Sequence, residues 1–411
     1  MKIGIIGAGA SGMMAAITAA KNGAKVTLFE KNDRVGRKIL VTGNGKCNLS
    51  NLEFDMSKYY CADKDKLSRI FKQYSLDDVI TFFEESGMMI RSKNGYLYPY
   101  SEQASTVLDV LRTNLEKEKI IVITECDITR ARYNKEIKKF EVAGNGKNWQ
   151  FDRLIIACGG PAAQKKNEGI SGFRLAEGFG HSIKKLVPGL VQLRAYDKNF
   201  FKMVSGVRFQ ARATLMIEGN RICEEMGEVQ FTDYGLSGIP IFQFSREAAY
   251  ALDEGKKVSV LINLFPDKTK KELEKQIYMR YNACLQDTLE EFLLGTVNKK
   301  LNQAMMKAAG LKPSDKISEL GFTKVLKFLM SYSEINIHIA AVNDMQNAQV
   351  CAGGVDFAQI STELESLKCP GLYFAGEVID VDGKCGGYNL QWAWTSGYLA
   401  GKNAAEASRE N

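Results

Sequence analysis

The chain has 411 residues, more than one ordinary hydrophobic core accommodates, so we expect two or three domains. Hydrophobic residues at 45% and charged residues at 25% are close to globular averages, which argues against a disordered chain and against a membrane bundle. The 55 Lys and Arg exceed the 48 Asp and Glu by +7, but they are spread along the chain and form no basic arm. Nucleic acid is therefore not expected as a partner.

Cysteine usage and the first residues bear on the compartment. The nine Cys include no C-x-x-C pair and accompany only two His, so we expect reduced thiols, no disulfide framework and no metal site. Residues 3–20 are uncharged and resemble a signal peptide or a membrane span. The glycines at positions 7, 9 and 12 would weaken a helix there and favour a strand, a turn and then a helix. We therefore expect a cytoplasmic protein without a membrane segment.

The first motif is a glycine-rich turn between a β-branched run at 2–6 and a helical run at 13–22. In such a turn the first glycine permits the tight bend, the second lets the backbone approach a pyrophosphate, and the third lets helix pack on strand. A second strand is expected at 25–29, followed by an acidic residue that can accept hydrogen bonds from a ribose and that repels a ribose phosphate. The site thus suits the ADP half of FAD or NAD rather than NADP. Its predicted residues are Gly7, Gly9, Ala10, Ser11, Gly12, Glu30 and Lys31.

A second loop, 34–48, is rich in Gly and Asn and has basic residues before it. Backbone N–H groups of such a loop can hold a pyrophosphate or the edge of a flavin. An ordinary surface loop is the alternative for this stretch taken alone. The predicted cofactor residues here are Arg37, Lys38, Thr42, Gly43, Asn44, Cys47 and Asn48.

Two later segments favour FAD over NAD. A strand at 151–157 runs into small residues, and a buried strand at 371–377 is followed by a second glycine-rich stretch and a helix at 390–405. An extended FAD is too long for one turn and needs a second anchor. A helix that starts near position 387 would direct its amide dipoles at the flavin pyrimidine and favour the reduced form. The predicted residues are Gly159, Gly376, Glu377, Asp382, Gly386, Gly387, Tyr388 and Asn389.

Several segments together resemble one bacterial family of FAD-dependent oxidoreductases that carry a characteristic insert domain. They are TGNGKCN, FTDYGLSGIP, the stretch from Ala352-Gly353-Gly354-Val355 onward, and AGEVIDVDGKCGGYNLQWAWTSG. Members of this family are similar to aminoacetone oxidases and to reductases of bile-acid dehydroxylation, and the resemblance covers nearly the whole chain. Two positions depart from the family pattern. Lys46 stands where Arg is common and lacks its planar fork, and Asp233 stands where His is frequent.

The resemblance and the residue patterns together predict an α/β fold. We expect a Rossmann-type FAD/NAD(P)-binding domain built from both chain ends, 1–186 and 341–411. Alternating stretches at 211–217 and 257–264 predict an antiparallel β-barrel inserted at 187–266, and 267–340 is expected to be a small helical subdomain.

The flavin would carry the chemistry, with hydride transfer at its N5 atom. Because no second dinucleotide motif follows, NAD(P)H would dock only transiently, or an organic substrate would reduce the flavin and oxygen would reoxidise it. The leading hypothesis is reduction by NAD(P)H of an activated C=C in an apolar carbonyl compound, a steroid or bile-acid-like enone being one candidate. The alternatives are an amine oxidase of the aminoacetone type and an RNA-associated or redox-sensing flavoprotein. Candidates for substrate contact are Asp233 and Tyr234, for which a turn role is the alternative.

Overall fold

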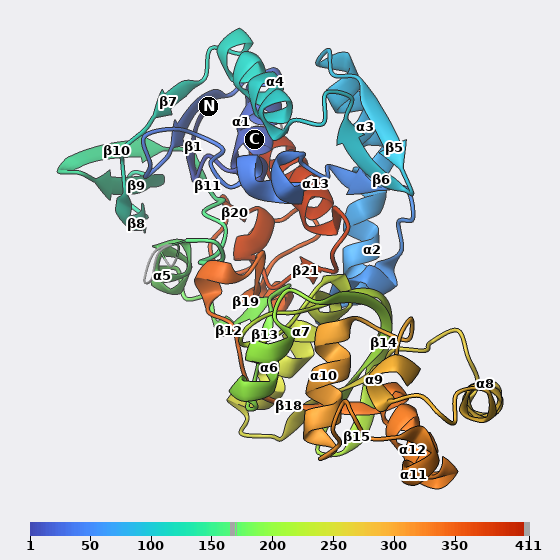
Figure 1. The fold of residues 1–411 in the computed structure, drawn as a ribbon. Helices are drawn as coiled ribbons and strands as arrows, with labels where there is room; N and C mark the ends of the chain where they lie inside the picture. The colour runs from blue at the N-terminus through green and yellow to red at the C-terminus, as the bar shows by residue number, and fades with distance from the viewer. Residues whose placement is uncertain (165–168, 170, 407–411) are drawn as a thin grey trace. The chain divides into compact units, whose positions relative to one another are not determined.

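The computed structural model describes residues 1–164, 169 and 171–406. The chain divides into two compact units (Figure 1). Unit 1 comprises residues 1–187 and 349–411, and unit 2 comprises residues 188–348. The sequence therefore leaves unit 1, completes unit 2 and returns, as a discontinuous Rossmann-type domain with an insert requires.

A five-stranded parallel sheet forms the centre of unit 1. Its order is β20–β11–β1–β2–β7, and every neighbouring pair is parallel. The order places β20 at one edge of the sheet, beside β11, the strand that leads into the predicted glycine-containing segment near 159. The strands are β1 (Lys2–Ile6), β2 (Lys25–Phe29), β7 (Ile121–Ile123), β11 (Arg153–Ile156) and β20 (Leu372–Phe374).

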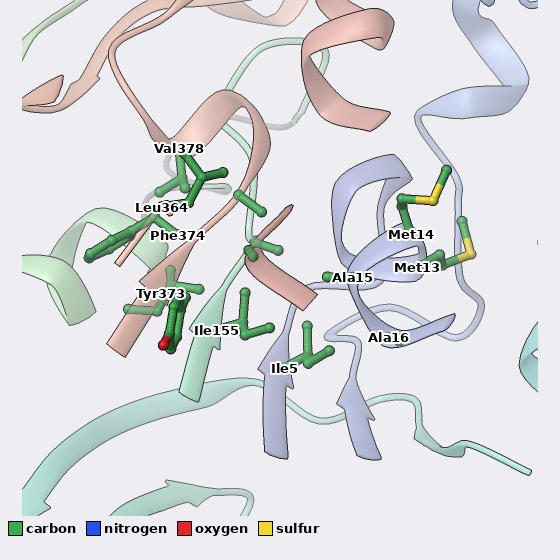
Figure 2. Close-up of a cluster of buried hydrophobic side chains, with 14 of the residues drawn as sticks. Ile5, Met13, Met14, Ala15, Ala16, Ile155, Leu364, Tyr373, Phe374 and Val378 are labelled. Atoms are coloured by element: carbon green, nitrogen blue, oxygen red, sulfur yellow. The ribbon is translucent and has the colours of Figure 1, made fainter. Parts of the chain in front are cut away.

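Two helices, α1 (Ala10–Lys21) and α13 (Tyr388–Glu406), pack against each other in unit 1. Figure 2 shows Ile5 of β1 and Ile155 of β11 near the small side chains of α1. Most residues of both helices are buried, and neither has a strongly one-sided apolar stripe, as expected for helices covered on more than one side. The C-terminal segment thereby joins the core that the N-terminal segment begins.

The remaining elements of unit 1 surround this centre. The helices are α2 (Lys64–Gln73), α3 (Leu76–Glu85), α4 (Ala104–Lys117) and α5 (Ser171–Gly178). One small antiparallel sheet has β3 (Ser50–Asn51), β6 (Tyr96–Pro99) and β5 (Ile90–Lys93), and another has β10 (Lys147–Phe151), β9 (Lys139–Gly144) and β8 (Ile128–Asn134). Two pairs complete the unit, β4 (Tyr59–Tyr60) with β21 (Asp382–Gly383) and β12 (Ile183–Gly189) with β19 (Val350–Val355).

Unit 2 contains a closed antiparallel barrel, which confirms the predicted inserted barrel. Two boundaries differ from the prediction, because residues 335–340, assigned to the helical part, belong to the last barrel strand, and residues 341–348, assigned to the FAD-binding domain, belong to unit 2. That strand alternates buried and exposed residues, and its partner β17 lies before the helices in sequence. In barrel order the strands are β13 (Leu193–Ala195), β16 (Gly235–Ser237), β15 (Asn220–Phe231), β14 (Arg208–Ile217), β17 (Val258–Asn263) and β18 (Ile335–Val342).

The helices of unit 2 share a hydrophobic core with this barrel, and that core is separate from the core of unit 1. In the part of the chain that the structure describes, no helix has the length and apolar character needed to cross a membrane. The helices are α6 (Lys198–Val204), α7 (Ile239–Asp253), α8 (Lys270–Ala283), α9 (Leu289–Phe292), α10 (Lys299–Ala308), α11 (Ile317–Leu320) and α12 (Phe322–Met330).

Candidate dinucleotide site

The glycine-rich turn connects β1 to α1, and its three glycines face different surroundings. At Gly7, with φ of 103°, a Cβ would lie 2.5 Å from the carbonyl oxygen of Ala157. At Gly12 a Cβ would lie 1.8 Å from the carbonyl oxygen of Gly7, so no side chain fits there. At Gly9, in contrast, no atom lies within 4 Å of the Cβ position. Two glycines therefore permit close packing, and the third leaves open space beside the backbone.

The N-terminus of α1 has no side-chain cap. Its N-cap residue is Gly9, and the first intrahelical bond runs from the N–H of Met13 to the carbonyl of Gly9 at 3.0 Å. The earlier N–H groups of the first turn have no intrahelical acceptor, and the first turn contains no acidic residue. Uncapped N–H groups and the positive end of the helix dipole attract an anion such as a pyrophosphate.

Glu30 follows β2, and its carboxylate forms a hydrogen bond with the glycine-rich turn. Only 8% of this residue is exposed. One carboxylate oxygen accepts from the N–H of Ala8 at 3.1 Å, and the other accepts from the N–H and the side chain of Asn32 at 2.9 and 2.5 Å. Arg37 donates to the side-chain oxygen of Asn32 at 2.9 Å. The predicted ribose acceptor is thus fixed beside the glycine turn by its own loop.

An ion pair joins the second loop to the C-terminal segment. Nζ of Lys38 lies 2.6 Å from Oε2 of Glu377, and Oε1 of Glu377 accepts from the N–H of Cys351 at 2.8 Å. A Cβ on Gly159, which has φ of 66°, would lie 3.6 Å from the same Oε2. Three predicted segments, near positions 38, 159 and 377, therefore meet at one place. Lys31, which precedes this loop, does not join that cluster, and its side chain donates to the side chain of Gln164 at 2.7 Å.

The loop at 42–48 has a tightly folded backbone. Gly43, Asn44 and Cys47 have φ of 55°, 54° and 56°, and the hydroxyl of Thr42 donates to the carbonyl of Ile39 at 2.6 Å. Burial raises the pKa of the Cys47 thiol to about 12, which keeps it protonated at neutral pH. A protonated, buried thiol is a poor nucleophile, and the role of Cys47 in holding the cofactor stays a prediction.

Asn48 closes this loop and carries an unsatisfied polar atom. Its Oδ1 is buried and accepts no hydrogen bond from any of the described residues. A buried acceptor without a donor costs about 1–3 kcal/mol, so such atoms are rare unless a ligand or a water completes them. The atom therefore points to a donor group supplied from outside the chain.

The C-terminal segment leads into α13, which begins at Tyr388 as predicted for a helix start near position 387. Gly386 and Gly387 have φ of 130° and 92°, and a Cβ on Gly387 would lie 2.7 Å from the backbone of Ser50. The side chain of Asn389 accepts from the N–H of Gly383 at 2.8 Å and donates to its carbonyl at 2.7 Å. The start of α13 is thus held in a defined position.

Residues in or next to β3 and β4 make further contacts with the C-terminal segment that leads into α13. The hydroxyl of Tyr388 donates to the carbonyl of Glu53 at 2.9 Å, and the side chain of Asn51 donates to the carbonyl of Gly386 at 3.2 Å. Asp382 is buried in β21, which pairs with β4. Sequence reasoning did not identify Asn51, because a strand of two residues shows no periodicity.

All predicted cofactor residues lie in unit 1, and the features above fit an extended dinucleotide. The open space at Gly9 and the uncapped α1 suit a pyrophosphate, Glu30 suits a ribose, and Oδ1 of Asn48 suits a hydrogen-bond donor of the bound group. The two substrate candidates lie in unit 2. Asp233 is exposed, and the hydroxyl of Tyr234 accepts from the side chain of Asn343 at 3.4 Å, so their role stays a prediction.

The chain is similar to a known protein family and to characterised proteins over nearly its whole length. The family model described as "HI0933-like protein Rossmann domain" matches residues 1–403. The chain is 38% identical over 408 residues to the 3-dehydro-bile acid delta(4,6)-reductase of Clostridium scindens, which covers 98% of this chain and 99% of the relative. It is 30% identical over 400 residues to the ribosomal RNA dihydrouridine synthase of Haemophilus influenzae, which covers 96% of each chain.

A solved structure also resembles this chain. It is the 3-ketosteroid-delta4-(5alpha)-dehydrogenase of Rhodococcus jostii in complex with 4-androstene-3,17-dione, with a TM-score of 0.51 and 15% sequence identity. The match covers 98% of this chain and 96% of the dehydrogenase. At this identity the likeness shows a shared fold.

Proposed function

Because the chain belongs to the HI0933-like family of FAD-dependent oxidoreductases, we propose that it reduces an activated C=C of an apolar carbonyl compound with hydride taken from NAD(P)H. The reductase of Clostridium scindens, at 38% identity over nearly the whole chain, supports this reaction class. A steroid or bile-acid-like enone is the substrate class that we favour.

The observation that carries the proposal is the meeting of three distant segments within unit 1. The ion pair of Lys38 with Glu377 connects residues that are 339 positions apart. A dinucleotide bound by the turn at α1 alone would not need the C-terminal segment, whereas FAD has a second, flavin half to hold. We assign the ribose to Glu30, the pyrophosphate to the N-terminus of α1, and the flavin half to the loop at 42–48 and the start of α13.

Bound FAD would supply hydride transfer, and the chain would supply binding and electrostatics. The start of α13 is fixed by the contacts of Tyr388 and Asn389, so the positive end of its dipole has a constant direction. That dipole stabilises negative charge placed near Gly387 and thereby favours the reduced cofactor. A reductase of this kind requires a cofactor that NAD(P)H reduces almost completely.

The proposal is tested by separating the two half-reactions. Anaerobic FAD-loaded protein is mixed with NADH or NADPH while the flavin absorbance is recorded, and the reduced protein is then mixed with 4-androstene-3,17-dione or with oxygen. We expect rapid bleaching by one nicotinamide and faster reoxidation by the enone than by oxygen. Rapid reaction with oxygen, together with bleaching by aminoacetone, would support the amine oxidase instead.

A second candidate is the reduction of uridine in ribosomal RNA, which the names of relatives at 30% and 28% identity suggest. The C5=C6 bond of uracil is conjugated with a carbonyl, so its reduction is the same chemical step as enone reduction. The net charge of +7 is compatible with an RNA substrate. Ribosomal RNA from cells lacking the protein, analysed by mass spectrometry for dihydrouridine, distinguishes the two substrates.

A further inference from the structure

Unit 1 contains a polar pocket beside the predicted flavin segment. Its volume is about 170 Å³, which accommodates one ring of a substrate rather than a whole steroid. It lies between the loop at 42–48 and the hairpin of β5 and β6. The residues that line it are Lys46, Lys93, Asn94, Tyr96, Tyr98 and Glu102.

The pocket arises from the alternation of strand β6. Leu97 and Pro99 are buried in the core, so Tyr96 and Tyr98, which alternate with them, face the other side of the strand. Tyr96 also lies against the C-terminal segment, because a Cβ on Gly386 would be 3.2 Å from its ring atom Cε1. The side chain of Asn51, which holds the carbonyl of Gly386, is equally close to that position. Tyr96 therefore stands where the pocket meets the predicted flavin segment.

The pocket has an excess of positive charge. Nζ of Lys46 lies 2.6 Å from Oε2 of Glu102, and Arg91 pairs with the other oxygen of the same carboxylate. Lys93 is a third cationic side chain at this place. The lining side chains thus include two cations, Lys46 and Lys93, and one carboxylate, and this net positive charge favours negative charge on a bound oxygen atom.

We propose that this pocket binds the carbonyl end of the substrate and that the hydroxyl of Tyr96 donates a hydrogen bond to the carbonyl oxygen. The inference rests on the proposed function. Bound FAD, once reduced, would supply a hydride to the β carbon. The π electrons of the C=C would move onto the carbonyl oxygen, where Tyr96 would stabilise the negative charge, and water would supply the proton to the α carbon and leave hydroxide. The substrate gains two electrons, FAD loses them, and Tyr96 keeps its proton throughout.

The tyrosine hydroxyl is suited to this role because it stays protonated. Burial, followed by the nearby Cys385 and Glu53, raises the pKa of Tyr96 above its ordinary value. A neutral hydroxyl is a hydrogen-bond donor, and its interaction strengthens as negative charge develops on the acceptor oxygen. The same interaction would serve an enone and the conjugated carbonyl of a uracil.

The test compares Tyr96→Phe with the matched control Tyr100→Phe, which removes the same hydroxyl group from an exposed residue just after β6 that does not line the pocket. We expect reoxidation of the reduced holoenzyme by 4-androstene-3,17-dione to slow by about 100-fold in Tyr96→Phe, as for loss of one oxyanion donor. Reduction by NAD(P)H should be unchanged, and Tyr100→Phe should retain reoxidation within about threefold of wild type. Equal reoxidation rates in wild type and Tyr96→Phe would overturn the inference.

A second measurement does not depend on turnover. para-Chlorophenol, whose phenolate mimics an enolate oxygen, is titrated into the oxidised holoenzyme, and binding is followed by its long-wavelength charge-transfer absorbance. We expect a dissociation constant at least tenfold higher in Tyr96→Phe than in wild type or Tyr100→Phe. If no enone reoxidises the wild-type protein, the proposed function fails. A higher dissociation constant for para-chlorophenol in Tyr96→Phe would still support the binding of an oxyanion in this pocket. Equal constants in all three proteins would reject the role of Tyr96.

Discussion

Two buried polar groups of the candidate site differ in whether the fold supplies their hydrogen-bond donors. Both oxygens of the Glu30 carboxylate accept hydrogen bonds from the surrounding loop. Oδ1 of Asn48 accepts none from the described part of the chain. Each oxygen of the first group already has a partner in the fold, although Oε2 can accept one more hydrogen bond, whereas the second group has no partner among the described residues. Substitution of the two residues should therefore change folding stability and cofactor affinity in different proportions.

Replacing Glu30 by Ala should weaken both properties. The substitution removes the predicted ribose acceptor and leaves the buried N–H of Ala8 without a partner. We expect the free energy of FAD binding to weaken by about 1–3 kcal/mol and the apoprotein to unfold at lower urea concentration. Fluorescence titration of the apoprotein with FAD measures the first effect. Asp33→Ala, at a neighbouring exposed carboxylate, is the control and should bind FAD normally.

Replacing Asn48 by Leu should separate the two properties. Leucine has a similar shape but no buried acceptor to leave unsatisfied, so the apoprotein should keep its unfolding free energy within about 1 kcal/mol of wild type. Affinity for FAD should fall by about 1 kcal/mol or more, because a donor of the bound group loses its acceptor. Paired urea unfolding and FAD titration measure both quantities. An unchanged FAD dissociation constant would show that Asn48 does not contact the cofactor.

A buried histidine in unit 1 predicts a pH dependence of stability. Nε2 of His181 lies 2.7 Å from the hydroxyl of Ser366, and its Nδ1 is buried without a partner among the described residues. Burial, and then the charge of Lys368, lower the pKa of His181 from its ordinary value of 6.5. Below pH 6.5 the unfolded chain therefore binds more protons than the folded chain, and stability falls as the pH drops through the folded-state pKa.

The variant His181→Gln should lose this dependence. We expect its unfolding free energy to fall less steeply than that of wild type between pH 7 and pH 5, by up to about 1.4 kcal/mol per pH unit. Urea unfolding at several pH values provides the measurement. The chain has one other histidine, His338, which is exposed on β18, and His338→Gln should keep the wild-type slope. Equal slopes of unfolding free energy against pH for wild type and His181→Gln would contradict the assignment of this pH dependence to His181.

At the scale of elements, the contact between α1 and α13 depends on two glycines four residues apart. A Cβ on Gly397 would lie 2.4 Å from the carbonyl oxygen of Ser11, and a Cβ on Gly401 would lie 2.3 Å from that of Ala15. The two backbones approach so closely that no side chain fits at either position. The contact joins α1, to which we assign the pyrophosphate, to α13, which starts at the predicted flavin segment.

Gly397→Ala should destabilise unit 1 although alanine is the better helix former. The added methyl group meets backbone, which has little room to move, so we expect a loss of about 1–3 kcal/mol in unfolding free energy and weaker FAD retention. Gly178→Ala, near the end of α5 with no atom within 4 Å of the new Cβ, is the matched control and should be neutral or slightly stabilising. Equal unfolding free energies for Gly397→Ala and Gly178→Ala would show that the close contact between α1 and α13 does not contribute to stability.

The sequence predicted the elements of the cofactor site well because each carries a strong local signal. The structure places β1 at Lys2–Ile6 and β2 at Lys25–Phe29, as expected from their β-branched residues and the glycines between them. The hairpin of β5 and β6 was missed, although residues 96–99 alternate, because four residues are too short a run to identify a strand by periodicity. Strand β18 was missed because its barrel partner β17 is separated from it by more than seventy positions of helical pattern.

At the scale of the whole molecule, the chain has two hydrophobic cores with no residue in common. All the assigned FAD contacts belong to unit 1. A ligand stabilises only the folded state that binds it, by about 2.7 kcal/mol at 100 times its dissociation constant. Calorimetry of the apoprotein should therefore show two transitions, of which excess FAD raises only one. A single transition that shifts as a whole would show that the two units unfold together.

The position of the C-terminal strand and helix has a consequence for synthesis. Ser11 donates to the carbonyl of Ala375 at 3.3 Å across 364 positions, and β20 completes one edge of the parallel sheet. At a translation rate of about 5–20 residues per second, the N-terminal turn waits about 20–70 seconds for these partners. Unit 2, which is continuous in sequence, can fold on the ribosome during that interval. If the C-terminal segment holds the flavin half as we propose, FAD is loaded only after that segment has left the ribosome, and prematurely terminated chains would remain without flavin.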